Sequence, residues 1–152
     1  MANHPVRFGN ASLRCICLFH SGPRVLKISV NHKLFRISAA LLGIAVALGA
    51  FGAHGLKDMV EPDRIGVWEK AVRYQMLHAV ALMIVAVAAN HLAAKTLKRA
   101  SVLFQVGILL FSGSLYLLVL LDVPALGAVT PLGGIAMIAG WIVLAIHKPS
   151  NL

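Results

Sequence analysis

Four long apolar stretches, separated by short polar segments, dominate the chain from about residue 34 onward. Each is about 20 residues long, and a helix of that length matches a hydrocarbon core about 30 Å thick. The apolar residues fill whole blocks and not the single stripe of a soluble helix. The pattern predicts an all-α membrane protein, a four-transmembrane-helix bundle with spans at about 34–53, 74–94, 101–121 and 131–146.

The polar segment 54–73, between the first two spans, has its own helical signature. Pro62 lies between two acidic residues, which is typical of a helix start. Ile65, Trp68 and Val72 then recur at helical spacing. We predict a short interfacial amphipathic helix that runs into the second span, with Trp68 in the aromatic belt at the membrane surface.

Residues 1–33 form a basic N-terminal extension without a single Asp or Glu, and we expect it to be disordered. It contains both cysteines, Cys15 and Cys17, with His20 nearby. A zinc site normally needs four ligands, so two reduced thiols are the simpler interpretation and no metal is expected. The apolar run Leu13–Phe19 is broken by Arg14 and is too short for a transmembrane span.

Composition agrees with a membrane protein. Of the 152 residues, 59% are apolar and only 12% are charged, about half of the usual charged share. The net charge of +9 raises the question of nucleic acid as a partner. The basic residues lie in short clusters between apolar blocks and form no basic face, so nucleic-acid binding is not expected.

The distribution of Lys and Arg predicts the orientation of the chain. With four spans, the two termini and the 95–100 segment share one side and hold ten of the 14 basic residues, against four on the other side. Without residues 1–29 the ratio is six to four. Because cytoplasmic segments are enriched in Lys and Arg, both termini are predicted to be cytoplasmic.

Several motifs are similar to those of a known family. The string Gly49-Ala50-Phe51-Gly52-Ala53-His54-Gly55-Leu56 resembles the signature of the YgdD-like family of small bacterial inner-membrane proteins, whose animal relatives resemble transmembrane protein 256. This is domain of unknown function family 423. The resemblance covers about residues 33–147 and implies four helices in a bacterial inner membrane, without a known activity. Further matching motifs lie around Trp68–Ala79, Phe111–Tyr116, Thr130–Gly134 and Gly140–Trp141.

The N-terminal residues depart from this family, whose members begin just before the first span. Val30-Asn31-His32-Lys33-Leu34-Phe35 resembles such a beginning. One hypothesis is that Val30 marks the true start, encoded by a valine-type initiation codon. The alternative is an organelle transit peptide, which is basic and poor in acids. N-terminal sequencing of the native protein distinguishes them.

Polar residues of these motifs are candidates for a site. On the second span, Tyr74, Gln75 and His78 lie within about one quadrant of the helix. Polar groups in hydrocarbon need partners, so this face is expected to point into the bundle. We predict a cluster in the periplasmic half of the membrane, open or nearly open to the periplasm, that consists of His54, Tyr74, Gln75, His78, Ser114 and Tyr116.

Three roles for this cluster are possible from the residue types. It can tie helices together, since interhelical hydrogen bonds contribute about 0.6 kcal/mol each on average. It can bind or conduct a small solute or a proton, because two histidines titrate near neutral pH. Catalysis is the least expected role, because two histidines without an intramembrane carboxylate make a poor metal or general-acid site. We therefore expect no enzymatic activity and no cofactor.

Small residues are abundant on more than one face of the predicted helices, and small residues let helices approach closely in lipid. This favours a small structural or accessory protein that packs in the bilayer against itself or a larger membrane complex. A transporter-like or channel-like unit is the alternative. The residues predicted to mediate helix packing are Gly43, Ala45, Gly49, Gly52, Gly133 and Gly140.

Overall fold

Four long helices make up most of residues 30–147, the part of the chain that the computed structural model describes. All four are long and apolar enough to cross a membrane. The predictions about residues 1–29, their disorder and a start of translation after them, lie outside the described residues. At the end of the predicted extension 1–33, His32 and Lys33 are already helical. The helices are α1 (His32–His54), α2 (Pro62–Val87), α3 (Ala94–Leu121) and α4 (Thr130–Ala145), with short 3-10 segments η1 (Ala88–His91) and η2 (Pro124–Ala128).

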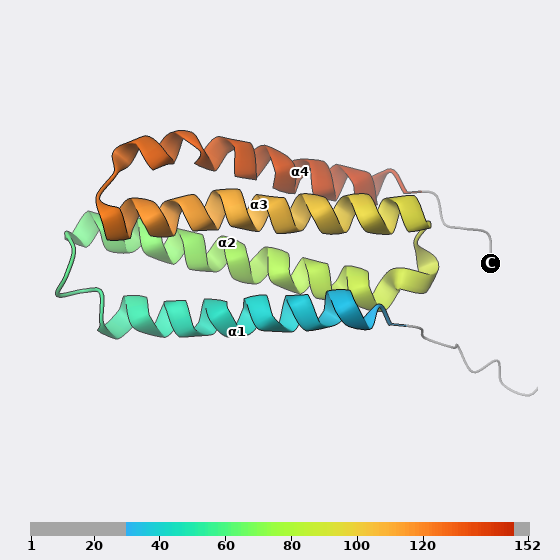
Figure 1. Cartoon of the computed structure of the whole chain (residues 1–152), viewed down its shortest axis with the longest axis horizontal. Coiled ribbons are helices and arrows are strands. Elements are labelled where there is room, and N and C mark those ends of the chain that lie inside the picture. Colours follow the sequence, from blue (N-terminus) through green and yellow to red (C-terminus); the bar gives the residue numbers. More distant parts are fainter. Residues whose placement is uncertain (1–29, 148–152) are drawn as a thin grey trace, which may run out of the picture.

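The helices alternate in direction, so α1 begins and α4 ends at the same end of the molecule (Figure 1). We call this the terminal end, and the opposite end the far end. At the terminal end, the Asn31 side chain caps α1 by accepting a hydrogen bond from the Leu34 N–H at 3.1 Å. The Asn31 N–H donates to the Ala86 carbonyl at 2.9 Å. The start of α1 is thereby joined to the last turn of α2.

Helix α2 begins at Pro62, as predicted, and continues without interruption to Val87. The amphipathic segment expected at the interface therefore forms the first turns of α2 and is not a separate helix. Neither a proline nor a turn motif interrupts the chain after Pro62, so the helix propagates.

Helix α3 begins seven residues before the predicted span. The basic segment that contains Lys95, Lys98 and Arg99 was left outside the predicted spans, but it forms the first turns of α3. Lys, Leu, Arg and Ala are all strong helix formers, and their long side chains reach the headgroup layer from the first turns of a helix. The actual link to α2 is η1 and the residues Leu92 and Ala93.

The helices pack in chain order, α1 on α2, α2 on α3 and α3 on α4. Extensive contact between α1 and α4 does not occur within residues 30–147. Figure 1 shows the resulting row of four helices, with α1 and α4 at its two edges. The protein is an all-α four-helix membrane protein, as predicted, but the four helices form an open layer and do not close into a ring.

Four glycines allow neighbouring helices to approach closely. One of them, Gly107, was not among the predicted packing positions, and a Cβ there would lie 2.6 Å from the Met137 side chain of α4. A Cβ on Gly133 would lie 2.3 Å from the backbone nitrogen of Phe111, and one on Gly140 would lie 2.7 Å from the Phe104 ring. A Cβ on Gly52 would lie 2.5 Å from the indole of Trp68. These contacts hold α4 against α3 and α2 against α1.

The other predicted packing positions differ from one another. Ala45 is fully buried, and a Cβ on Gly49 would lie in ordinary contact with Val72 at 3.4 Å. Gly43 does not pack against another helix, because nothing lies within 4 Å of the position of its Cβ. Small residues were predicted to lie on more than one face of the helices. On α1, the face with Ala45 and Gly49 packs on α2, and the face with Gly43 does not.

Candidate functional site

Gln75, near the middle of α2, is the centre of the polar contacts between helices. Its amide nitrogen donates to the Leu41 carbonyl of α1 at 2.9 Å. Its amide oxygen accepts a hydrogen bond from the Tyr116 hydroxyl of α3 at 3.0 Å. The side chain is only 4% exposed, so it makes these bonds away from water. One residue thus joins three helices.

His78 lies one turn further along α2 and is also buried. Its Nδ1 is 2.8 Å from the Tyr74 carbonyl, and its Nε2 accepts a hydrogen bond from the Trp141 indole of α4 at 3.3 Å. The ring packs beside Phe104 and Trp141, at centroid distances of 5.8 and 6.2 Å, and these two rings also contact each other at 5.1 Å. The two contacts fit a neutral imidazole with its proton on Nδ1.

Two serines of α3 make further contacts with neighbouring helices. The Ser114 hydroxyl is 2.9 Å from the Thr130 hydroxyl at the start of α4, and it also donates to the Phe111 carbonyl. Ser112 donates to the Ala71 carbonyl of α2 at 2.8 Å. Ser112 was absent from the predicted cluster. The small residue Ala71 on the polar face of α2 could have indicated this contact, because a small side chain lets α3 approach the α2 backbone.

Both tryptophans direct their indole N–H groups at another helix. Trp68, predicted in the aromatic belt, is 1% exposed and donates its indole N–H to the Leu48 carbonyl of α1 at 2.8 Å. The missing side chain of Gly52 makes room for this ring. Trp141 is 44% exposed, yet its N–H is directed at His78 and not at the membrane surface.

The structure does not bring all predicted residues together. His54 is exposed at the end of α1 and has no hydrogen-bond partner among residues 30–147. Tyr74 stacks on Phe111 at a centroid distance of 4.5 Å, and its carbonyl contacts His78. The remaining residues form separate contacts along the helices: Gln75 with Tyr116, His78 with Trp141, and Ser114 with Thr130.

The cluster was predicted in the half of the membrane opposite the two termini, and His78 does not lie close to the far end of α2. It lies 16 residues after the start of α2 and nine before its end. At 1.5 Å per residue, these separations are about 24 Å and about 14 Å. His78 is therefore nearer the terminal end than the far end.

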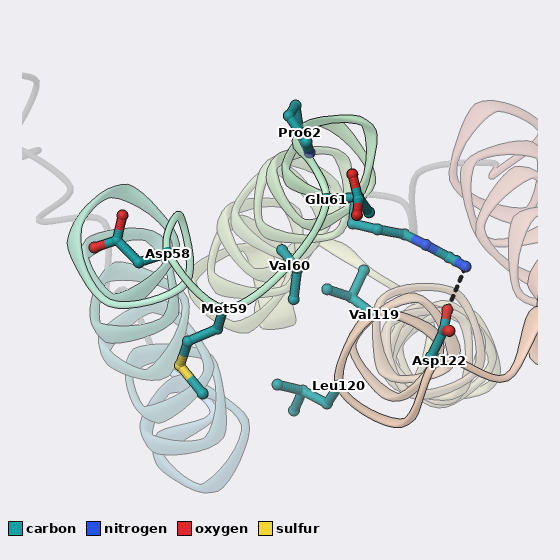
Figure 2. Close-up of a pocket in the computed structure, with 9 residues that line it drawn as sticks. Asp58, Met59, Val60, Glu61, Pro62, Val119, Leu120 and Asp122 are labelled. Carbon is teal, nitrogen blue, oxygen red and sulfur yellow. Dashed lines mark hydrogen bonds and ion pairs between the residues drawn. The ribbon is translucent and has the colours of Figure 1, made fainter.

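A pocket of about 550 Å³ lies at the far end, between the start of α2 and the end of α3. Arg64 bonds to Asp122 there at 2.5 Å. Asp122 ends α3 in the left-handed conformation, with φ of 51°. Figure 2 shows that the Asp58 carboxylate points away from those of Glu61 and Asp122, so the acids that line the pocket do not converge. Among the described residues, no three His, Cys, Asp or Glu side chains are placed to hold a metal ion.

The four membrane-length helices and their mutual hydrogen bonds define a small multi-pass membrane protein. Residues 48–134, more than half of the chain, match the model of the family described as "Protein of unknown function (DUF423)". The chain therefore belongs to this family, and the resemblance inferred from its motifs is confirmed.

Curated relatives are bacterial proteins named UPF0382 membrane proteins. One from Staphylococcus aureus is 47% identical over 115 residues, which are 75% of this chain and 93% of that protein. The UPF0382 membrane protein YwdK of Bacillus subtilis is 44% identical over 116 residues, which are 75% of this chain and 94% of that protein. No solved structure matches the chain. The chain is thus an integral membrane protein of a family without a known activity.

Proposed function

We propose that the protein is a small structural or accessory membrane protein, a preformed helical unit that associates with a second copy or with a larger membrane complex. Most of the buried polar side chains bond to a neighbouring helix, and no buried side-chain nitrogen or oxygen among the described residues lacks a partner. These groups stabilise the helix arrangement. The proposal includes neither an enzymatic activity nor a cofactor.

The observation that carries the proposal is the uncovered small-residue face of α1. Ala39, Gly43, Ala47 and Ala50 recur at helical spacing and are all exposed. Nothing lies within 4 Å of a Cβ on Gly43. In lipid, helices associate where small residues let their backbones meet, so this face is suited to receive another helix.

Substitution of Gly43 by leucine tests this association. The native size of the complex in membranes is measured by blue-native electrophoresis and by cross-linking. We expect Gly43→Leu to reduce the assembled fraction by about tenfold, while the monomer keeps its thermal stability because the added Cβ has no neighbour within 4 Å among the described residues.

Gly113→Leu on α3 is the matched control, because a Cβ there also meets open space. It should leave the complex intact. A wild-type protein that is monomeric in native membranes, or a complex that tolerates Gly43→Leu, would contradict the proposal.

We further propose that the protein lies in the bacterial inner membrane with its terminal end in the cytoplasm. The excess of Lys and Arg on the terminal side supports this orientation. The bacterial origin of the curated relatives supports the assignment to a bacterial membrane.

The alternative, a unit that conducts a small solute or a proton, depends on His78. Both ring nitrogens of His78 already have partners, and a proton on Nε2 would face the Trp141 N–H. This pattern favours a structural role over a proton relay. Proton flux into liposomes that contain the purified protein, if abolished by His78→Ala, would support the alternative instead.

A further inference from the structure

A second open pocket, of about 340 Å³, lies at the terminal end between the first turns of α1 and α3. Extensive contact between α1 and α3 does not occur in the described part of the chain, since both pack on α2. This leaves a groove between them. Lys33 and Lys98 line the groove from its two sides, together with Leu34, Ile37 and Val102. We call it the terminal groove.

The charges around the terminal groove are all of one sign. All five acidic residues of the chain lie toward the far end, and the one ion pair within residues 30–147, Arg64 with Asp122, is also there. Within residues 30–147, Lys33 and Lys98 therefore have no carboxylate partner. Helix α3 begins at Ala94 without a side-chain cap, and its positive dipole end adds to the same field. The groove is complementary to an anion.

The deeper part of the groove is apolar. Leu34 is buried in the core at its floor, beside Leu82 and Phe104. Ile37 and the half-exposed Val102 line the groove closer to the membrane centre than Lys33 and Lys98 do. Lys33 is the second residue of α1 and Lys98 the fifth of α3, so both lie near the level of the headgroups. A cationic entrance above an apolar floor fits an amphiphile with an anionic head.

We propose that the terminal groove binds one anionic phospholipid, with its phosphate between Lys33 and Lys98 and the first carbons of an acyl chain on Leu34, Ile37 and Val102. Basic pockets between transmembrane helices are suited to anionic headgroups. On α1 the groove face and the small-residue face with Gly43 are about 130° apart, so a lipid does not compete with the proposed helix association. The inference also does not depend on which end is cytoplasmic.

Lipid binding is measured by native mass spectrometry of the detergent-purified full chain, with phosphatidylglycerol and phosphatidylethanolamine of the same acyl chains. We expect the wild-type protein to retain phosphatidylglycerol preferentially. The double variant Lys33→Gln/Lys98→Gln should bind it about tenfold more weakly, because each lysine near the headgroup contributes to the attraction.

Lys57→Gln/Lys70→Gln is the matched control, since it removes the same charge near the far end, and it should leave the binding unchanged. Thermal unfolding without added lipid checks that the double variant folds. Displacement of the lipid by millimolar inorganic phosphate would assign the groove to free phosphate and overturn the lipid proposal. Equal binding of both phospholipids, or equal loss in both double variants, would overturn it as well.

Discussion

At the scale of single residues, the Gln75 amide carries two of the polar contacts that cross between helices. It joins α2 to the backbone of α1 and to a side chain of α3. In hydrocarbon the amide cannot exchange these partners for water, so each contact is retained. The helix arrangement near the middle of the layer therefore depends strongly on this one side chain.

Gln75→Leu should lower the free energy of unfolding by about 1–2 kcal/mol, because both interhelical bonds are lost and the Tyr116 hydroxyl loses its partner. Reversible unfolding in mixed micelles measures this change. Gln105→Leu is the control, because Gln105 bonds only to the Ser101 carbonyl of its own helix. It should change the free energy of unfolding by less than about 0.5 kcal/mol. Equal effects of the two substitutions would refute the role assigned to Gln75.

Residue types and helical spacing predicted the partners of some side chains and not of others. Gln75 and Tyr116, predicted in one cluster, are hydrogen-bonded to each other, because the polar face of α2 turns inward. His54 does not take part, since it ends its helix where the chain leaves the layer. Trp68 was placed at the membrane surface from its depth alone. Trp68 is buried because its ring fills the space beside Gly52. A single sequence does not reveal which side chain packs on a given glycine.

At the scale of elements, α4 is held to α3 by backbone proximity. Gly133 contacts the backbone of Phe111, and Gly140 contacts the Phe104 ring. Most of the remaining side chains of α4 are at least partly exposed. The position of α4 is therefore fixed by a small number of close contacts, and a single added methyl group can disturb it.

Gly133→Ala should destabilise the protein by about 1–3 kcal/mol, because its Cβ would overlap the Phe111 backbone and force α4 away from α3. The neighbouring substitution Gly134→Ala should be neutral or slightly stabilising, since its Cβ would meet only the Phe111 ring at 3.8 Å. Both changes alter helix propensity equally, so the difference in thermal unfolding temperature isolates the steric effect. A Gly133→Ala variant as stable as Gly134→Ala would show that the two helices separate easily.

The sequence predicted the number of helices and most of their ends. Spans predicted at 34–53 and 131–146 correspond to α1 and α4 within about two residues. The start of α3 was missed because charge was taken as the mark of a link, whereas basic residues continue a helix into the headgroup layer. The apolar span gives the part of a helix that lies in hydrocarbon, but a helix can extend beyond it into the headgroup layer through charged residues.

At the scale of the whole molecule, the helices form an open layer with unequal ends. The acidic side chains lie toward the far end, and the charged side chains at the terminal end of residues 30–147 are all basic. The periodicity of the spans contained no information on how the helices are arranged, because a row and a ring satisfy the same apolar pattern. The charge distribution, by contrast, follows directly from the sequence once the chain crosses the membrane four times.

The proposed orientation is tested by single cysteines in a Cys15→Ser/Cys17→Ser background. Met59→Cys lies in the exposed link at the far end, and Ala93→Cys lies in the exposed link between α2 and α3 at the terminal end. A membrane-impermeant maleimide should label Met59→Cys in intact cells, and Ala93→Cys only after the cells are permeabilised. The reverse labelling would place the terminal end outside the cytoplasm.

A row of helices with two unlike edges restricts the symmetry of any assembly. If α1 meets α1 of a second copy, the contact is two-fold and self-limiting, and the assembly stops at two subunits. If α1 meets α4, each subunit offers one edge to the next, and the assembly grows until it closes as a cyclic ring. The exposed small residues of α1 favour the first arrangement, so a dimer with a free α4 on each side is the expected stoichiometry.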